Sequence, residues 1–517
     1  MTETEQKATQ LTDLASDILL VIFLNLDVED VLALTQSCRV LYAIGSLDYL
    51  WHKLVRTCNL PLDIPLGADS ATLSGQELQA IVVKALKLDH NWRKPGACIE
   101  RAIPTIPGDK TPMDSMHLLP GGKWLITTQL VRRYTHQLSR RGLYAEIVGL
   151  TLWCLGDISG PRSIKTIPIY ASVTSCRAYY QSAQHKVIIA VALQEPEEDS
   201  EWFEVYHISL DDPAVVTHSE ALTFQHKFAS VFNIDNLRIY EDVLGATFYH
   251  QIVDQDHIRH PETGYVYLRN LVTGAAASFE LYDKQDGKPC FELLRDQFAL
   301  TWKHDSEEFV SFYDVPPSII SANLASPAES GPNHMTEEIL SARCRLSHCN
   351  AFSYRASSGS VEHGIPIFST MTFDSPPHNI LTEHFSPPNH ETRFSDCPNI
   401  ATHVFPHPTS MIRHLQLGVT GRRAVWVDSG AAVILKKWTS SRYCRGEELS
   451  AGTSELILPF YPDDIHQMAF DEGTCRLCVS LCTGELYQCD FLRDLIIMQN
   501  TCNLCIGPSI SYAAALH

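Results

Sequence analysis

The chain has 517 residues, of which 45% are hydrophobic, 9% aromatic and only 19% charged. This composition can fill large buried cores, and the length favours more than one domain. With 60 Asp and Glu against 40 Lys and Arg the formal charge is −20, and because such a field repels a phosphate backbone, nucleic-acid binding is not expected.

The N-terminal region carries no sign of targeting or of membrane insertion. Residues 1–10 are polar and lack the apolar segment of a signal peptide, and we expect them to be flexible. The densest apolar run, Ile18 to Leu24, is much too short to span a bilayer. The 16 cysteines are scattered, unlike those of a small disulfide scaffold. We therefore expect a cytoplasmic or nuclear protein with no membrane contact.

Three short helices are predicted within residues 14–57. The first begins near Ser16, which is a good N-cap, and shows i, i+3, i+4, i+7 apolar spacing. The second follows Asp27, has acidic residues in its first turn and is stopped by Gly45. The third is centred on Trp51. The pattern therefore indicates a small helical unit at the start of the chain.

The first predicted helix has more apolar surface than so small a unit can bury. Ile18, Leu20, Val21 and Leu24 lie off its main stripe. A helix that is apolar almost all round needs a partner to cover the excess. That partner can be another protein or the rest of the same chain, and composition leaves both open.

The stretch LASDILLVIFLNLDVEDVLALTQSCRVLYAIGSLDYLWHKLV resembles an F-box, whose pattern has an apolar first helix, a Cys-Arg-x-Leu/Trp-Tyr segment and a closing Leu-Trp pair. The matching positions are Leu14, Asp17, Ile18, Leu19, Ile22, Phe23, Leu26, Leu32, Leu34, Cys38, Arg39, Leu41, Tyr42, Leu50 and Trp51. The resemblance covers about one tenth of the chain. One departure is Ala15, which stands where the family usually has proline.

The resemblance implies that this unit binds a Skp-type adaptor, which links it to a cullin and a RING protein. The residues it implies for adaptor binding are Leu14, Ala15, Ile18, Leu19, Ile22, Phe23, Leu34, Cys38, Leu41, Leu50 and Trp51. Because the usual proline belongs to the adaptor-facing surface, Ala15 is expected to weaken that interface modestly.

Residues 58–99 are predicted to form a linker and a connecting helix. The linker is rich in Pro, Gly, Asp and Ser. Ser74 and Glu77 then form a capping-box pattern, with Leu73 and Leu78 placed for a hydrophobic staple. We expect this helix to end before residue 91 and to pack the F-box against the domain that follows.

From about residue 100 the pattern changes to paired apolar runs separated by turn signals. The pairs are 124–128 with 148–155, 187–193 with 203–210, 243–249 with 265–271, 298–302 with 309–315, 424–427 with 433–437, and 475–481 with 486–491, with a less regular run at 365–373. First strands begin near 124, 187, 243, 298, 365, 424 and 475, so the gaps run from 51 to 67 residues. This rhythm predicts a β-propeller over residues 100–517.

The fold class expected is thus multidomain, with a three-helix F-box at residues 11–57 followed by an all-β propeller of about six to eight blades, best seven. Phrases such as LLPGGKWLIT and TGRRAVWV resemble the divergent propellers of F-box proteins abundant in fungi. A pair of β-sandwiches or a β-helix is the alternative.

Two features are candidates for recognising a target. Residues 316–408 are rich in Pro, Ser, Asn and His, and parts of them should be long surface loops. A basic spot is the natural contact for an acidic or phosphorylated target on so acidic a protein. The arginines singled out for this role are Arg132, Arg133, Arg140 and Arg141, in the connection of the first strand pair, and Arg422 and Arg423 before the strand at 424.

The sequence offers little catalytic chemistry, and we expect no catalytic residues, metal or cofactor. Cys475 and Cys478 fall within a strand-like run, where residues i and i+3 point to opposite faces, so buried free thiols are favoured over a zinc site shared with Cys502 and Cys505. His403 and His407 have Pro406 between them, which excludes a helical metal motif. Paired Asp residues lie in turn-like segments, and there is no phosphate loop or nucleophile elbow.

The function favoured is therefore a substrate receptor of a ubiquitin ligase, without enzymatic activity of its own. Two alternatives remain open. One is a propeller hydrolase with F-box-like helices, using carboxylates that converge from distant blades. The other is an F-box scaffold that acts outside a ligase, which Ala15 keeps open.

Overall fold

The structure is a computed structural model that describes residues 11–491 except for several gaps. The gaps are residues 59, 65–69, 95–100, 107–110, 136–143, 157–160, 182–183, 196–199, 214, 224–230, 254–258, 282–289, 295, 305–306, 321–332, 335–339, 346–353, 363–364, 374–378, 386–398, 407–411, 430–432 and 441–450. Among the described residues no helix has both the length and the apolar character needed to cross a bilayer.

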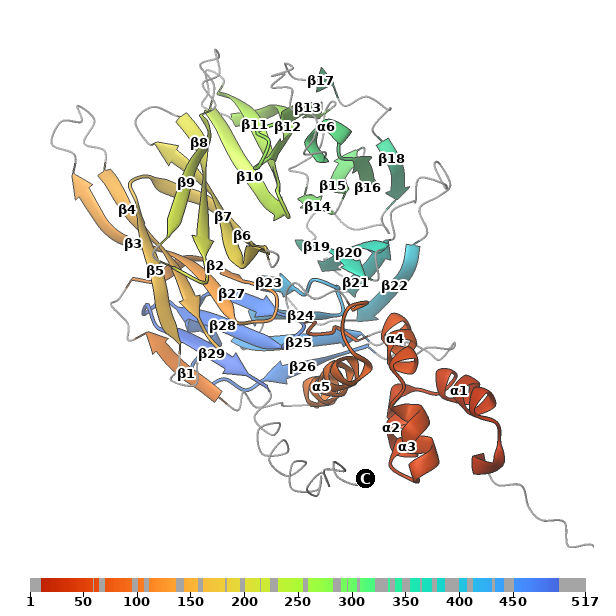
Figure 1. The fold of residues 1–517 in the computed structure, drawn as a ribbon. Coiled ribbons are helices and arrows are strands. Elements are labelled where there is room, and N and C mark those ends of the chain that lie inside the picture. Colours follow the sequence, from red (N-terminus) through yellow and green to blue (C-terminus); the bar gives the residue numbers. More distant parts are fainter. Residues whose placement is uncertain are drawn as a thin grey trace, which may run out of the picture.

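A helical unit opens the chain, as predicted, and lies to one side of the sheets (Figure 1). Its elements are a short 3-10 turn at Leu11–Asp13, α1 (Ser16–Leu24), α2 (Val28–Thr35), α3 (Arg39–Gly45), α4 (Asp48–Thr57) and the long connecting helix α5 (Gly75–Arg93). The core of this unit is apolar and takes residues from all five helices, α5 included.

The second predicted helix is in fact two helices. Cys38 is extended between α2 and α3, with φ −156° and ψ 164°. Just before it, the Ser37 hydroxyl donates to the Leu34 carbonyl at 2.7 Å. A serine hydroxyl that bonds a local carbonyl competes with helix continuation, so the apolar stripe is real but belongs to two short elements.

The described strands after α5 form seven sheets. Four sheets come first in the chain: β2 (Met113–Leu118), β3 (Trp124–Thr135), β4 (Tyr144–Cys154) and β5 (Arg162–Ile169); β6 (Ser172–Gln181), β7 (Lys186–Glu195), β8 (Ser200–Ser209) and β9 (Val216–Thr223); β10 (Val231–Tyr240), β11 (Val243–Val253), β12 (Arg259–Asn270), β13 (Ala276–Leu281) and β17 (Asn333–His334); and β14 (Cys290–Leu293), β15 (Gln297–His304), β16 (Glu307–Asp314) and β18 (Leu340–Arg345).

Three further sheets complete the set, and the last of them also uses the first strand of the chain. They are β19 (Tyr354–Glu362), β20 (Ile365–Phe373), β21 (Asn379–Phe385) and β22 (Asn399–Pro406); β23 (Ile412–Leu417), β24 (Arg423–Ser429), β25 (Val433–Ser440) and β26 (Ala451–Leu456); and β27 (Ile465–Asp471), β28 (Arg476–Leu481), β29 (Leu486–Asp490) and β1 (Arg101–Ile106). Among the described connections, two contain a short helical turn: α6 (Pro317–Ile320) and a 3-10 turn at Pro462–Asp464.

The sheets close into a ring. The first strand of each sheet contacts that of the next, in the order β2, β6, β10, β14, β19, β23, β27 and back to β2. Within each sheet the consecutive strands pair antiparallel; only β17 adds in parallel, to β13. β1 pairs antiparallel with β29, so the start of the domain completes the last sheet. A ring of radially arranged four-stranded sheets is a β-propeller, and the predicted fold class is confirmed.

The predicted strand pairs are confirmed, but their place in the sheets differs from expectation. Each pair forms the second and third strands of a sheet, as β7 and β8 do, so another strand precedes each one that was expected to come first. Val187 to Leu193 in β7 are all fully buried, because a middle strand is covered on both faces. The first and fourth strands are less apolar and were missed. Part of the segment 316–408, expected to hold long loops, forms β18 to β22.

Candidate functional site

The residues implied for adaptor binding divide into a buried and a surface group. Five are interior, at most 4% exposed: Leu19, Phe23, Leu41, Leu50 and Trp51. The Trp51 indole donates to the Gly45 carbonyl at 2.7 Å. These five side chains pack the helices together. Because they are buried, they support an adaptor interface only by keeping the helices in position, and not by direct contact.

The surface group lies on α1 and beside it. Ile18 is 48% exposed and Val21 59% exposed, three residues apart on one face of α1. Ala15 is also exposed, and Leu14, Ile22, Leu34 and Cys38 are partly buried. When a partner covers apolar side chains of this size, the burial stabilises the complex by about 25 cal/mol per Å² of apolar surface. The excess apolar surface predicted for this helix is therefore present in the folded chain.

Several exposed apolar residues of the helical unit were not among those implied for adaptor binding. They are Leu11, Val21, Val40, Tyr42, Leu47 and Tyr49. Their positions in the helices could have identified them. Val40 and Tyr42 flank the buried Leu41 on α3, and residues adjacent in the sequence of a helix point to different sides of it. The family pattern emphasises apolar identity, which does not separate core from surface.

The N-terminus of α1 differs from the prediction in one detail. The helix begins at Ser16, but the N-cap position is Ala15, with φ −62° and ψ 146° and no side-chain cap. The Ala15 carbonyl accepts from the Leu19 amide at 3.0 Å. The backbone at Ala15 is thus already in the conformation that proline adopts.

Helix α5 begins as the sequence indicates. The Ser74 hydroxyl accepts from the Glu77 amide at 3.3 Å, and the Ser74 amide donates to the Glu77 carboxylate at 2.8 Å. Both halves of the predicted capping box are therefore present. The Gly75 amide donates to the Asp48 carboxylate at 2.7 Å and ties the start of α5 to α4. Leu78 and Val82 fill the core of the helical unit.

The other end of α5 is embedded in the propeller, and it extends beyond the predicted end at residue 91. Trp92 is 1% exposed and lies in a core cluster with residues of the sixth and seventh sheets. Its ring stacks on Phe470 with centroids 5.3 Å apart and meets Phe491 edge-on at 5.1 Å. Its indole donates to the Trp438 carbonyl at 3.2 Å. The prediction that α5 packs the F-box against the next domain is confirmed.

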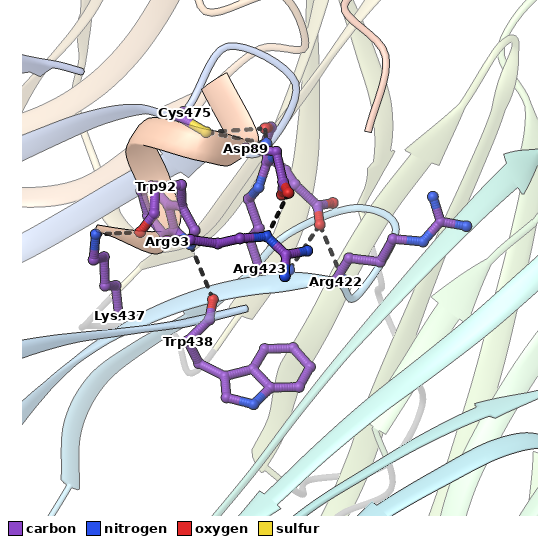
Figure 2. Close-up of polar contacts among 9 residues, drawn as sticks. Asp89, Trp92, Arg93, Arg422, Arg423, Lys437, Trp438 and Cys475 are labelled. Carbon is purple, nitrogen blue, oxygen red and sulfur yellow. Dashed lines mark hydrogen bonds and ion pairs between the residues drawn. The ribbon is translucent and has the colours of Figure 1, made fainter. Parts of the chain in front are cut away.

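Arg423, expected to contact a target, is instead a buried residue that binds α5. Its guanidinium is 1% exposed and pairs with Asp89 of α5 at 3.1 Å, as Figure 2 shows. It also donates to the Glu472 carbonyl at 2.9 Å and to the Cys475 sulfur at 3.0 Å. A charge at this depth is stable only with partners, and these come from α5 and the seventh sheet. Arg423 is therefore not on a target-binding surface.

Arg422 lies next to a buried carboxylate and is itself partly buried. The Glu472 carboxylate accepts the amides of Thr420, Arg422 and Arg423 at 2.6, 2.9 and 2.8 Å. Burial raises the pKa of Glu472, against the opposing effect of Arg423. In Figure 2 the Arg422 side chain points away from that of Arg423. Hydrogen bonds from the turn before β24 to Glu472 thus connect the sixth sheet to the seventh.

The first arginine cluster lies only partly within the described residues. Arg132 and Arg133 are in β3, opposite Ile147 and Glu146 of β4, and not in the connection between the strands as predicted. Strand β3 runs on to Thr135 and so includes them. Arg140 and Arg141 lie outside the described residues. A target-binding role for this cluster stays a prediction.

The cysteines considered for a metal site have different surroundings. Cys475 lies in the core cluster shared with α5, whereas Cys478 lies in the cluster between the seventh and first sheets. Burial raises the pKa of each thiol to about 12. Cys502, Cys505 and His407 lie outside the described residues. Within the part of the chain that the structure describes, no group of three or more His, Cys, Asp or Glu could hold a metal ion.

Comparison with known protein families finds a match for the helical unit. Residues 13–57 match the family model described as F-box-like. No curated protein sequence matches the chain. Similar solved structures include the β-propeller domain of Myceliophteria thermophila Cps50 (Swd1), with 11% identity, TM-score 0.40, and 75% of this chain and 99% of that chain covered.

Two other structures show similar values. The Dos1 propeller has 11% identity and a TM-score of 0.38, with 76% of this chain and 95% of that chain covered. The acylaminoacyl peptidase of Pyrococcus horikoshii has 8% identity and a TM-score of 0.39, with 76% of this chain but only 55% of the peptidase covered. The chain thus carries an F-box-like unit at residues 13–57, followed by a β-propeller.

Proposed function

We propose that this protein is a substrate receptor of a cullin–RING ubiquitin ligase. Its F-box-like unit binds a Skp-type adaptor, and its propeller binds the target. Transfer of ubiquitin is carried out by other subunits, and this chain contributes proximity by holding the target near them. It has no catalytic residues of its own in this scheme, and it needs no cofactor.

The observation that carries the proposal is the exposed apolar face of α1, within residues that match the F-box-like model. Ile18 and Val21 lie there in water, whereas the helix's other face, with Leu19 and Phe23, is fully buried. A helix of nine residues whose apolar side chains point both inward and outward is built to be covered by a partner. In an F-box that partner is the adaptor.

The propeller offers the second surface that a receptor needs. Its strands are held by ladders, so recognition is left to the loops and turns that connect them. We place the target on those loops and on the end of β3 beside them, with Arg132, Arg133, Arg140, Arg141 and Arg422 as candidate contacts for an acidic or phosphorylated segment. Arg423 is excluded because it is buried against α5.

A calorimetric titration of purified adaptor into the full chain tests the proposal. Replacing both apolar residues of the exposed face, Ile18→Ser with Val21→Ser, is expected to weaken binding at least tenfold. Val272→Ser is the matched control, because Val272 is 65% exposed but lies on the propeller. Equal affinity for the α1 double variant and the control would reject α1 as the adaptor site.

A further inference from the structure

Four polar side chains lie on the innermost strands of the first four sheets, and we call them the axial cluster. They are His117 of β2, Arg177 of β6, Arg238 of β10 and Glu292 of β14. These strands contact one another in that order, and in Figure 1 they border the centre of the ring. The cluster therefore lies within strands at the propeller axis, and not in the loops that connect them.

Three members of the axial cluster occupy equivalent positions in consecutive sheets. Arg177, Arg238 and Glu292 each follow a buried residue on their own strand and lie opposite a small residue on the second strand. The buried residues are Cys176, Leu237 and Phe291, and the small ones are Ala190, Gly245 and Ala299. Three neighbouring sheets thus each place one charged side chain at the same level of the ring.

Two of these charged side chains bind each other. The Glu292 carboxylate accepts from the Arg238 guanidinium at 2.8 and 2.7 Å. A guanidinium that meets a carboxylate through two hydrogen bonds has a fixed geometry. The Arg238 side chain is 20% exposed and that of Glu292 only 9% exposed. One positive charge of the axial cluster is therefore balanced by the neighbouring sheet.

Arg177 is charged but contacts no carboxylate among the residues that the structure describes. Its guanidinium donates to the Cys176 carbonyl at 2.9 Å, and this carbonyl carries no net charge. Burial and, next, the charge of Arg238 lower the pKa of Arg177 to about 10, whereas Glu292 acts in the opposite direction. The group is still charged at pH 7. A guanidinium has five N–H donors, and a buried charge is stable only with a counterion.

His117 adds no charge to the axial cluster. Its Nε2 lies 3.0 Å from the Ala178 carbonyl of β6, and because a carbonyl only accepts, this nitrogen carries the proton. Burial and, next, the charge of Arg177 lower the pKa of His117 to about 3, so the ring is neutral at pH 7. At this pH the cluster contains two cations and one carboxylate, which leaves one positive charge without a partner.

We propose that the axial cluster binds a small free oxyanion of the size of phosphate, held mainly by the Arg177 guanidinium. The planar fork of a guanidinium matches two oxygens of such an anion. The cluster is a positive spot at the axis of a chain whose net charge is −20. Its place within strands, and not on loops, favours a free anion over a segment of a protein target. The inference does not rest on the proposed function.

Titration of the full chain with inorganic phosphate tests the site. Calorimetry should detect phosphate binding at pH 7.5, and Arg177→Gln should weaken it at least tenfold. Urea denaturation gives a second readout. Without phosphate, Arg177→Gln should be at least as stable as the unaltered chain, because it no longer buries an unpaired charge. With phosphate the unaltered chain should become the more stable of the two, since a ligand of the folded state stabilises it.

The matched control is Arg162→Gln, which removes the same charge from an exposed position of β5 and should leave phosphate binding unchanged. Phosphate is kept too dilute for the general stabilising effect of salts, and sodium chloride of equal ionic strength is the reference. If Arg177→Gln does not fold, the unaltered chain still decides: equal stability in phosphate and in chloride would overturn the proposal.

Two other results would also overturn the proposal. The first is equal phosphate affinity in Arg177→Gln and Arg162→Gln, because the anion would then bind elsewhere. The second concerns the source of the phosphate group, and its probe is a phosphoserine blocked at both ends. If this probe binds more tightly than inorganic phosphate, the cluster recognises a phosphorylated protein segment and not a free anion.

Discussion

Trp92→Ala should destabilise part of the propeller, although Trp92 belongs to a helix outside the ring of sheets. The side chain is 1% exposed and packs among apolar residues of the sixth and seventh sheets. Replacing a buried Trp with Ala lowers the free energy of unfolding by about 3–5 kcal/mol, because apolar burial is lost and a cavity is left behind. This range includes the loss of the two aromatic contacts of Trp92. We expect the free energy of unfolding of these two sheets to fall by about that much.

Leu78→Ala is the matched control, because Leu78 lies in the same helix but in the core of the helical unit. Its cost, about 2–5 kcal/mol, should fall on α1–α4 instead. Urea denaturation followed by circular dichroism gives the size of each effect, and hydrogen exchange by mass spectrometry gives its location. Trp92→Ala should raise exchange in β24, β25, β27 and β28. If exchange rises only within α5, our reasoning that the helix end is part of the propeller core is wrong.

Three further substitutions test separate parts of the account. Burial raises the pKa of Asp471 to about 6, so ionising this carboxyl group destabilises the folded protein. The destabilisation is absent below pH 4 and complete above pH 6. Asp471→Asn should therefore raise the free energy of unfolding by about 1–2 kcal/mol at pH 7.5 and leave it unchanged at pH 4, as measured by urea denaturation at both pH values. Gly45→Ala places a methyl 1.8 Å from the Thr35 side chain and should destabilise the helical unit by about 1–3 kcal/mol, with the propeller melting transition unchanged. Ala15→Pro fits the backbone at φ −62° and should stabilise the same unit by about 0.4–1 kcal/mol in thermal denaturation; a loss of stability would contradict the placement of α1.

The parts of the fold that follow from local patterns were predictable. The middle strands of the sheets are nearly all apolar because both their faces are buried, and the run from Val187 to Leu193 is an example. The capping box at Ser74 and Glu77 has a signature only four residues long. Such features depend on neighbours in sequence, so one chain is enough to show them.

The features that depend on distant partners were not predictable. Arg422 and Arg423 are two adjacent basic residues after a glycine, which resembles an exposed turn. What buries Arg423 is Asp89, which is 334 positions away. The split between buried Leu19 and exposed Ile18 on α1 is a similar case, since an almost wholly apolar helix does not indicate which face turns inward.

Reconstitution with purified adaptor and cullin–RING subunits tests the central claim most directly. The full chain should elute with the cullin in size-exclusion chromatography only when the adaptor is present. A chain that lacks residues 1–57 should fold, since Trp92 and its contacts in the propeller core are retained, but should elute alone. Co-elution of that truncated chain, or failure of the full chain to join the complex, would contradict the account of this protein as a ligase receptor.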